Sequence, residues 1–288
     1  MIKKVVIPAA GLGTRLLSAT KEQPKEMLPV FAKDSNGALC LKPLVQLIFE
    51  QLYDFGIRNF CFIVGRGKRA IEDHFTPDYQ FIKSLDDKGK NSQASQLESF
   101  YKIVDASTIV WVNQPEPKGF GHAVLQAKSF IGDEPFLVHA GDTYIVSEGN
   151  DHLNRLIKEH QSKSTDVSLL LQEVHDPRQY GVAEVIREGS KLIVKRVVEK
   201  PEQPKTNLAI MPIYVFNPVI FRALEAIGPG KGGEIQLTDG IQKLIDWRLE
   251  VRAIRLRERE LRLDIGTPET YWEAQRLSYE YFKEQARV

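Results

Sequence analysis

The chain has 288 residues, of which 42% are hydrophobic and 27% charged, and its formal net charge is +1. This is the composition of an ordinary globular protein, long enough for one large domain or two small ones. It excludes a strongly basic nucleic-acid binder. No run approaches the roughly 20 apolar residues of a membrane helix, so we expect no nucleic acid partner, no membrane and a cytoplasmic location.

Short β-rich runs alternate with amphipathic helical runs through the first half of the chain. The expected strands cover residues 3–9, 59–65, 108–114, 135–141 and 166–174, and the expected helices cover residues 44–56, 68–75, 121–131 and 151–161. This alternation predicts βαβ units. The predicted fold class is therefore α/β, with a Rossmann-like, doubly wound, mostly parallel sheet and helices on both faces.

Residues 76–108 interrupt this rhythm with a polar and charged stretch. We expect a helical surface insertion there with one or two helices, because a structureless loop of that length is unusual in a compact domain. A disordered linker between two domains is the alternative. Since the alternation resumes on the far side, we predict a single domain over residues 1–288.

From about residue 175 to 288 the pattern changes, and we expect a distinct C-terminal portion there. An antiparallel pair is expected over 183–200, a strand at 208–216, helices at 218–227 and 234–247, and a hairpin made of 249–257 and 260–266. A last helix is expected over 267–285, with Thr267 as its cap and Pro268 at its first position. These segments add an antiparallel β portion to the fold.

The segment that follows the first expected strand reads AAGLGTRLLSATKEQPKEMLPV over residues 9–30. Its glycines let backbone N–H groups approach an anion closely, and Arg15 and Lys25 add positive charge. The third glycine of the dinucleotide fingerprint is replaced by Leu16, and the Walker A pattern is absent. The residues alone leave two interpretations open, a phosphate-binding loop and an ordinary solvated loop.

The order of these residues closely resembles the signature GxGTRxxPxT, followed by a PK pair, of the sugar-phosphate nucleotidyltransferases, although Ser18 stands where that signature has proline. With ATK, PKEMLP and EIQLTD together, the chain is most similar to the bacterial-type UTP-glucose-1-phosphate uridylyltransferases. The resemblance implies the nucleotide-diphospho-sugar transferase fold and Mg²⁺-assisted transfer of a uridylyl group from UTP to glucose-1-phosphate. It also implies a homo-oligomer, a dimer or a tetramer, with residues 76–108 as a candidate contact surface.

Further motifs extend the resemblance over almost the whole chain. VNQPEPKGFGHAV (112–124) is similar to the family's base-binding segment, FLVHAGDTYI (136–145) and LRLDIGTP (261–268) to its metal-binding segments, and YGVAEV (180–185) and VVEKP (197–201) to its sugar-binding pieces. The resemblance places the nucleotide at Ala10, Gly11, Leu12, Gly13, Thr14, Gln114 and Gly119, and the sugar at Tyr180, Gly181, Glu199 and Lys200. It places the metal at Asp142 and Asp264, and gives catalytic roles to Arg15, Lys25 and Lys200.

The chemistry of the transfer accounts for these residue types. The attacking phosphate oxygen is already ionised, so the protein needs no general base. It must instead reduce the repulsion between two polyanions, align them in line and stabilise the leaving charge. Mg²⁺ is suited by one or two carboxylates with phosphate oxygens and water. His122 and His139 match neither a catalytic triad nor a metal-binding spacing, and we interpret both as structural.

Two alternatives to uridylyl transfer remain. The first is transfer of a thymidylyl or another nucleotidyl group to a hexose-1-phosphate, since base and sugar preference depend on few contacts. Met211 and Pro212 stand where the family more often has a small residue and a glycine near the sugar, which leaves the sugar open. The second is a non-catalytic sugar-nucleotide sensor, which has no need for both aspartates and both lysines.

Overall fold

A computed structural model describes residues 2–34, 36–161 and 165–284. The strands are β1 (Lys4–Pro8), β2 (Pro29–Lys33), β3 (Leu39–Pro43), β4 (Asn59–Val64), β5 (Thr108–Asn113), β6 (Phe136–His139), β7 (Thr143–Val146), β8 (Val167–Glu173), β9 (Gly181–Glu188), β10 (Lys191–Glu199), β11 (Leu208–Phe216), β12 (Val251–Arg255) and β13 (Leu261–Asp264). The helices are α1 (Leu17–Thr20), α2 (Leu44–Asp54), α3 (Arg69–His74), α4 (Tyr79–Asp87), α5 (Asn91–Asp105), α6 (Phe120–Gln126), α7 (Lys128–Ile131), α8 (Asp151–His160), α9 (Val219–Glu225), α10 (Leu237–Asp246) and α11 (Pro268–Glu284). Short 3₁₀ turns cover η1 (Thr14–Leu16), η2 (Lys25–Met27), η3 (Glu148–Asn150), η4 (Pro177–Gln179) and η5 (Lys231–Gly233).

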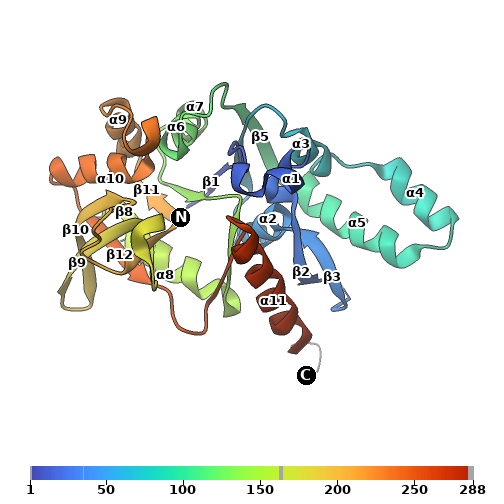
Figure 1. The fold of residues 1–288 in the computed structure, drawn as a ribbon. Helices are drawn as coiled ribbons and strands as arrows, with labels where there is room; N and C mark the ends of the chain where they lie inside the picture. The colour runs from blue at the N-terminus through green and yellow to red at the C-terminus, as the bar shows by residue number, and fades with distance from the viewer. Residues whose placement is uncertain (1, 35, 162–164, 285–288) are drawn as a thin grey trace.

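A nine-stranded sheet runs through the molecule in the order β5-β4-β1-β6-β11-β8-β12-β10-β9 (Figure 1). The half made of β5, β4, β1 and β6 is parallel, as the βαβ pattern predicted. In the other half, β11 lies antiparallel between β6 and β8, and β10 and β9 are also antiparallel. The complete sheet is therefore mixed, because β11 runs antiparallel to both of its neighbours, β6 and β8.

Each face of the sheet is covered by its own helices, which confirms the doubly wound α/β architecture. The apolar residues of α2, α3 and α8 pack on one face, and those of α6, α9 and α10 pack on the other. Within β1, Val5 and Ile7 belong to the first cluster and Val6 to the second. A strand with apolar side chains on both faces is what a sheet covered on both sides requires.

The hairpin predicted from residues 249–257 and 260–266 is wrong. β12 pairs with β8 and β10, whereas β13 leaves the large sheet and pairs antiparallel with β7. The polar run that suggested a turn includes Glu260, which is buried. Its carboxylate accepts hydrogen bonds from Arg155 of α8 at 2.8 and 2.6 Å, so the run is anchored to a helix and carries the chain across to β7.

The structure also contains a hairpin, β2–β3, that the sequence analysis did not predict. The Asp34 carboxylate accepts hydrogen bonds at 2.8 Å from the backbone N–H groups of Asn36 and Ala38, which organises the turn. Helix α11 packs on β2, where the Tyr271 hydroxyl donates to the carbonyl oxygen of Pro29 at 3.0 Å. The N–H of Thr270 donates to the Thr267 hydroxyl at 3.2 Å, so the predicted cap is confirmed.

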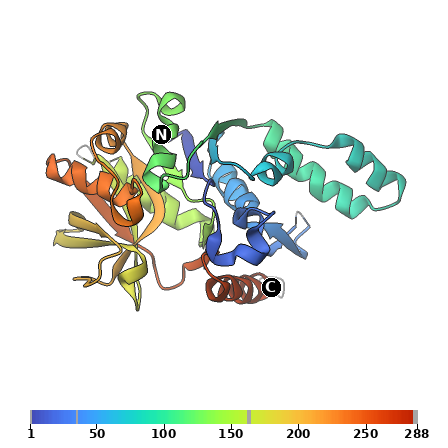
Figure 2. The ribbon, with the colours of Figure 1, turned by 45° about the horizontal axis from the view of Figure 1, so that its top comes forward.

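Residues 76–108 contain the helices α4 and α5, which pack against each other and project from the rest of the molecule (Figures 1 and 2). The expected surface helices are therefore present, while the single-domain assignment over residues 1–288 stays a prediction. In the described part of the chain, no helix combines the length and the apolar character that crossing a membrane would need.

Candidate active site

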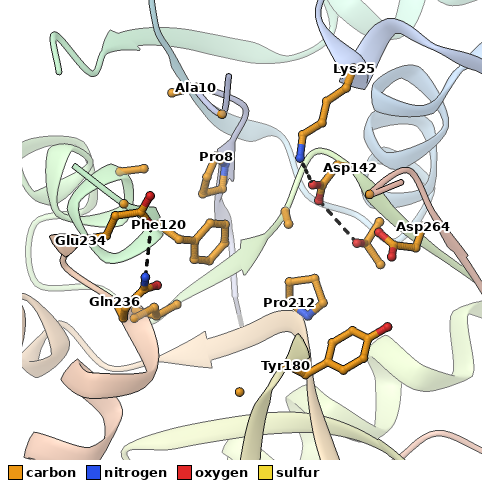
Figure 3. A pocket seen from close by; sticks show the side chains of 18 of the residues that line it. Pro8, Ala10, Lys25, Phe120, Asp142, Tyr180, Pro212, Glu234, Gln236 and Asp264 are labelled. Carbon is orange, nitrogen blue, oxygen red and sulfur yellow. Dashed lines mark hydrogen bonds and ion pairs between the residues drawn. The ribbon is translucent and has the colours of Figure 1, made fainter. Parts of the chain in front are cut away.

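A cavity of about 700 Å³ lies where β1, β5 and β6 end (Figure 3). The carboxyl edge of parallel strands is where α/β sheets bind ligands. The cavity is lined by every predicted site residue: Ala10, Gly11, Leu12, Gly13, Thr14, Arg15, Lys25, Gln114, Gly119, Asp142, Tyr180, Gly181, Glu199, Lys200 and Asp264. The structure therefore brings together residues from distant parts of the chain. Their individual roles stay predictions.

The glycine-rich loop after β1 is held in shape by Thr20. The Thr20 hydroxyl lies 2.8 Å from the carbonyl oxygens of both Gly13 and Leu16. Gly13 has φ of 65°, and a Cβ there would lie 3.2 Å from the Thr20 hydroxyl oxygen. Only glycine adopts this left-handed conformation at little cost. Gly13 and Thr20 together therefore set the shape of this loop.

Lys25 and Asp142 form an ion pair inside the cavity (Figure 3). Burial lowers the pKa of Lys25, but the charges of Asp142 and Glu26 outweigh it and the net shift is upward. Burial alone would raise the pKa of Asp142, yet the Lys25 charge and hydrogen bond hold it below its ordinary value. Both groups are therefore charged at neutral pH.

The pairing of β13 with β7 explains why the two aspartates are neighbours. In this ladder Asp264 is opposite Thr143, the residue after Asp142. The N–H of Ile265 also donates to the carbonyl oxygen of Asp142 at 3.0 Å. Burial raises the pKa of Asp264, and the negative charge of the neighbouring Asp142 raises it further.

These two carboxylates fit a divalent cation. Two half-buried like charges repel, and a bound cation relieves that repulsion. Among the residues that the structure describes, no group of three or more His, Cys, Asp or Glu side chains could hold a metal ion. An ion held by Asp142 and Asp264 would therefore complete its coordination with substrate and water oxygens, which is the habit of Mg²⁺.

The predicted base-binding segment packs against the EIQLTD segment. The N–H of Ile235 donates to the carbonyl oxygen of Lys118 at 2.8 Å, and the N–H of Gly121 donates back to Ile235 at 2.9 Å. Gly119 has φ of 105°, and a Cβ there would lie 2.7 Å from both the Glu234 Cβ and the Ile235 carbonyl oxygen. Gly119 is therefore required by this contact between chain segments, whatever it contributes to a ligand.

The predicted sugar-binding residues gather around Glu199. The Thr238 hydroxyl donates to the Glu199 carboxylate at 2.7 Å, and a Cβ on Gly181 would lie 2.8 Å from the same hydroxyl oxygen. The Lys200 N–H donates to the carbonyl oxygen of Tyr180 at 3.0 Å. Lys200 has φ of 42°, a strained conformation for a residue with a side chain and one that concentrates at functional sites.

A buried ion pair beside the cavity was missed by the sequence analysis. Glu26 and Lys68 are only 1% and 6% exposed, and Lys68 donates to the Glu26 carboxylate at 2.8 Å. Burial raises the pKa of Glu26, although the charges of Lys68 and Lys25 oppose it. Glu26 lies within the quoted PKEMLP stretch, but nothing in the sequence pairs it with Lys68, because that contact depends on the fold.

Arg262 was also missed. Its guanidinium donates to the Tyr180 hydroxyl at 2.9 Å and lies 5.0 Å from the centre of that ring. Arg262 and Asp264 are two residues apart on β13, so strand alternation puts them on the same face. The predicted role of Asp264 could therefore have pointed to Arg262 as a second cavity residue.

The sequence profile described as Nucleotidyl transferase matches residues 4–280 of this chain. The chain belongs to that family. Among its relatives, the UTP–glucose-1-phosphate uridylyltransferase of Bacillus subtilis (strain 168) is 42% identical over 248 residues, which cover 84% of this chain and 80% of the relative. The enzyme of the same name from Pseudomonas aeruginosa is 39% identical over 287 residues, 98% of each chain.

Solved structures of the family superpose over nearly the whole chain. A UDP-glucose pyrophosphorylase complexed with UDP-glucose has a TM-score of 0.80 and 32% identity, and the match covers 99% of this chain and 100% of that one. The UTP-bound enzyme of Acinetobacter baumannii has a TM-score of 0.81 and 31% identity, with 98% and 93% covered. The nucleotide-diphospho-sugar transferase fold implied by the resemblance is therefore confirmed.

Proposed function

We propose that this protein transfers a uridylyl group from UTP to glucose-1-phosphate and releases UDP-glucose and pyrophosphate. The observation that carries the proposal is the convergence of the predicted residues, from Ala10 to Asp264, on one cavity. The family relatives from Bacillus subtilis and Pseudomonas aeruginosa are named for this reaction. Of the two similar structures, one is a complex with UDP-glucose and the other is UTP-bound, which favours uridylyl over thymidylyl transfer.

In the proposed complex, the loop after β1 binds the triphosphate. Backbone N–H groups of residues 10–14 are suited to phosphate oxygens, and Arg15 adds a planar guanidinium that binds two oxygens at once. Gln114 and Gly119 lie at the end of the cavity formed by β5 and α6, and they bind the base.

Lys25 and Lys200 supply positive charge from separate segments of the chain. Lys25 is already charged beside Asp142, and we assign it to the reacting phosphates of UTP. Lys200 follows β10 and binds the phosphate of glucose-1-phosphate. Since that phosphate is ionised before it attacks, the protein contributes alignment and charge rather than proton transfer.

Asp142 and Asp264 would hold the Mg²⁺ ion, as their shared burial suggests. A bound ion there would supply positive charge to offset the negative charge of phosphate oxygens. Asp142 also holds Lys25 in the cavity before substrate binds, so it has a second role in which no metal takes part.

Glucose is assigned to the surface formed by Tyr180, Gly181 and Glu199. Thr238 orients the Glu199 carboxylate, which accepts hydrogen bonds from sugar hydroxyls. Of the two departures from the family pattern near the sugar, only Pro212 lines the cavity, because Met211 is fully buried on the other side of β11. Pro212 is therefore the residue through which sugar preference would differ.

We also propose a cytoplasmic location and a homo-oligomer, a dimer or a tetramer, both of which rest on the family resemblance. The surface of α4 and α5 is the candidate contact, since these helices project from the molecule (Figure 2). Light scattering on the purified protein after gel filtration would test the oligomer. A molar mass of about one chain would contradict it.

The function itself is tested by a substrate panel. Purified protein would be mixed with Mg²⁺, glucose-1-phosphate and one of UTP, dTTP, CTP, ATP or GTP, and pyrophosphate release would be measured. We expect UTP to be the best substrate. A higher rate with dTTP would support the thymidylyl alternative, and nucleotide binding without any turnover would support the sensor. Omission of Mg²⁺, with chelator present, should abolish pyrophosphate release.

A further inference from the structure

The side chain of Gln114 is fixed by the protein before any base arrives. Gln114 follows β5, and its backbone N–H donates to the carbonyl oxygen of Val64 at 2.7 Å. The residue is only 5% exposed, and it lines the cavity. The amide nitrogen lies 3.1 Å from the carbonyl oxygen of Gly119 and 2.9 Å from Nδ1 of His122.

These two contacts determine which end of the amide faces the cavity. A backbone carbonyl can only accept, so the group beside Gly119 must be the NH₂ end of Gln114. That nitrogen has two hydrogens, and the second points to His122. Both donors are thereby used inside the protein, and within the described chain no hydrogen bond to the Gln114 amide oxygen is found. The oxygen, which can only accept, is the atom left for a ligand.

The arrangement requires a neutral His122 whose Nδ1 carries no proton. An imidazole with an accepting Nδ1 carries its proton on Nε2, which lies 3.2 Å from the amide of Gln126. The Gln126 atom at that position is its amide nitrogen, which also lies 3.4 Å from the His122 carbonyl oxygen. A neutral ring that accepts at Nδ1 cannot also accept at Nε2, so the Gln126 amide must turn until its oxygen accepts the Nε2 proton. Burial lowers the pKa of His122, and the nearby Lys118 charge lowers it further while Glu116 opposes it. The neutral ring is thus the favoured form at pH 7.

We infer that His122 is a positioning residue that selects the base: it holds the Gln114 oxygen toward a pyrimidine N3–H. This inference rests on the proposed function and names its source of base specificity. Uracil and thymine both carry a hydrogen on N3, whereas cytosine has a lone pair there. A Gln114 oxygen that accepts therefore forms a hydrogen bond with uracil and with thymine. With cytosine the same oxygen faces N3, and neither of these two atoms carries a hydrogen to donate. A site built on one such hydrogen bond rejects the analogue that lacks it, since the buried group is left without a partner.

The test compares nucleotides in wild-type protein and in two variants, His122→Leu and His122→Asn. Leucine cannot accept a hydrogen bond, so the Gln114 amide keeps only the Gly119 contact and is free to turn. We expect the ratio of kcat/KM for UTP over CTP to fall by about tenfold or more. The ratio for UTP over dTTP should stay within about twofold, because both bases present the same N3–H. Asparagine retains an acceptor near the position of Nδ1 and should restore most of the UTP to CTP ratio.

The controls separate this inference from the proposed function. His175→Leu changes an exposed histidine outside the cavity and should leave all ratios unchanged. An inactive wild-type protein would contradict the proposed function and would say nothing about His122. An active His122→Leu protein with the wild-type UTP to CTP ratio would overturn the inference.

A second measurement needs no variant, and so it holds even if His122→Leu does not fold. Histidine ring nitrogens labelled with ¹⁵N report the tautomer directly by NMR. We expect His122 to be neutral at pH 7, with its proton on Nε2. A proton on Nδ1 would reverse the hydrogen bond with Gln114 and refute the positioning role.

Discussion

At the scale of single residues, the cavity depends on charged groups that are partly or wholly withdrawn from water. Lys25 and Asp142 keep each other ionised, and Asp142 raises the pKa of Asp264. Removal of one of these charges leaves its partner without a compensating charge nearby. The single substitutions that are most informative are therefore those that change one charge and little volume.

Asp142→Asn is the first of these. The amide has almost the same shape, but it withdraws the charge that pairs with Lys25 and that Mg²⁺ would need. We expect turnover in pyrophosphate release to fall by about a hundredfold or more, with an unchanged circular dichroism spectrum. Asp86→Asn, on the exposed face of α4, is the matched control and should retain full activity. Turnover of Asp142→Asn near the wild-type level would remove this aspartate from the mechanism.

Glu26→Gln tests the buried pair with Lys68. The substitution leaves the Lys68 charge buried without its partner, and breaking a buried pair in this way costs about 3–5 kcal/mol of unfolding free energy. Urea unfolding measures this loss. The double variant Glu26→Gln, Lys68→Met should recover part of it, since no buried charge is then left unpaired.

The control for that pair is Glu98→Gln, which breaks an exposed pair with Lys102 on α5. Exposed pairs contribute little, and we expect a change below about 0.5 kcal/mol. Equal losses in Glu26→Gln and Glu98→Gln would show that burial of Glu26 has no energetic consequence.

At the scale of elements, local signals predicted most of the strands and helices but missed β2, β3 and β7, and they did not predict how the strands pair. The alternation of apolar residues identified β12 and β13 correctly, yet their pairing as a hairpin was wrong because β13 finds its partner β7 more than a hundred residues away. The hairpin β2–β3 was missed since neither strand shows a strong apolar run. The insertion of β11 beside β6 likewise depends on contacts that no local pattern contains.

Gly119→Ala tests the contact between the base-binding segment and the segment that begins at Glu234. The new Cβ would clash with Glu234 and Ile235, so the two segments must separate and the base end of the cavity must change shape. We expect kcat/KM for UTP to fall by about ten- to a hundredfold.

Gly89→Ala is the matched control for that substitution. Gly89 also has a positive φ, of 69°, but a Cβ there meets nothing within 4 Å. The backbone strain costs about 1–2 kcal/mol of stability and should leave kcat/KM unchanged. Equal kinetic effects at the two glycines would mean that the conformation, rather than the contact with Glu234, controls the cavity.

At the scale of the whole molecule, the fold brings motifs from both ends of the chain to one cavity. The family resemblance predicted which residues would gather there, because the motifs can be identified in the sequence even where their contacts cannot be derived from it. It could not predict the Glu26 pair with Lys68 or the orientation of Gln114 by His122. Both depend on which side chains meet in three dimensions, and neither leaves a periodic or spaced signal in the sequence.

The stability of the whole fold depends on two further histidines, His139 of β6 and His152 of α8. Both rings are 0% exposed, and in the described structure neither Nε2 atom has a hydrogen-bond partner. Burial lowers the pKa of His139 to about 4 and that of His152 to about 3. In the unfolded chain both pKa values return to roughly 6.5, so below that pH the unfolded state binds more protons than the folded state.

The unfolding free energy should therefore decrease as the pH falls from about 6.5 toward 4, by up to about 1.4 kcal/mol per pH unit for each histidine. Urea unfolding at several pH values between 7.5 and 5 measures the slope. Glu26 and Asp264 have raised pKa values and act in the opposite sense, so the comparison of His152→Asn with the wild type isolates the contribution of His152. We expect the variant to be less stable at pH 7.5 but to have a shallower slope, whereas the exposed His175→Asn should keep the wild-type slope. Parallel slopes in His152→Asn and wild type would show that His152 accepts its proton equally well in the folded and unfolded states.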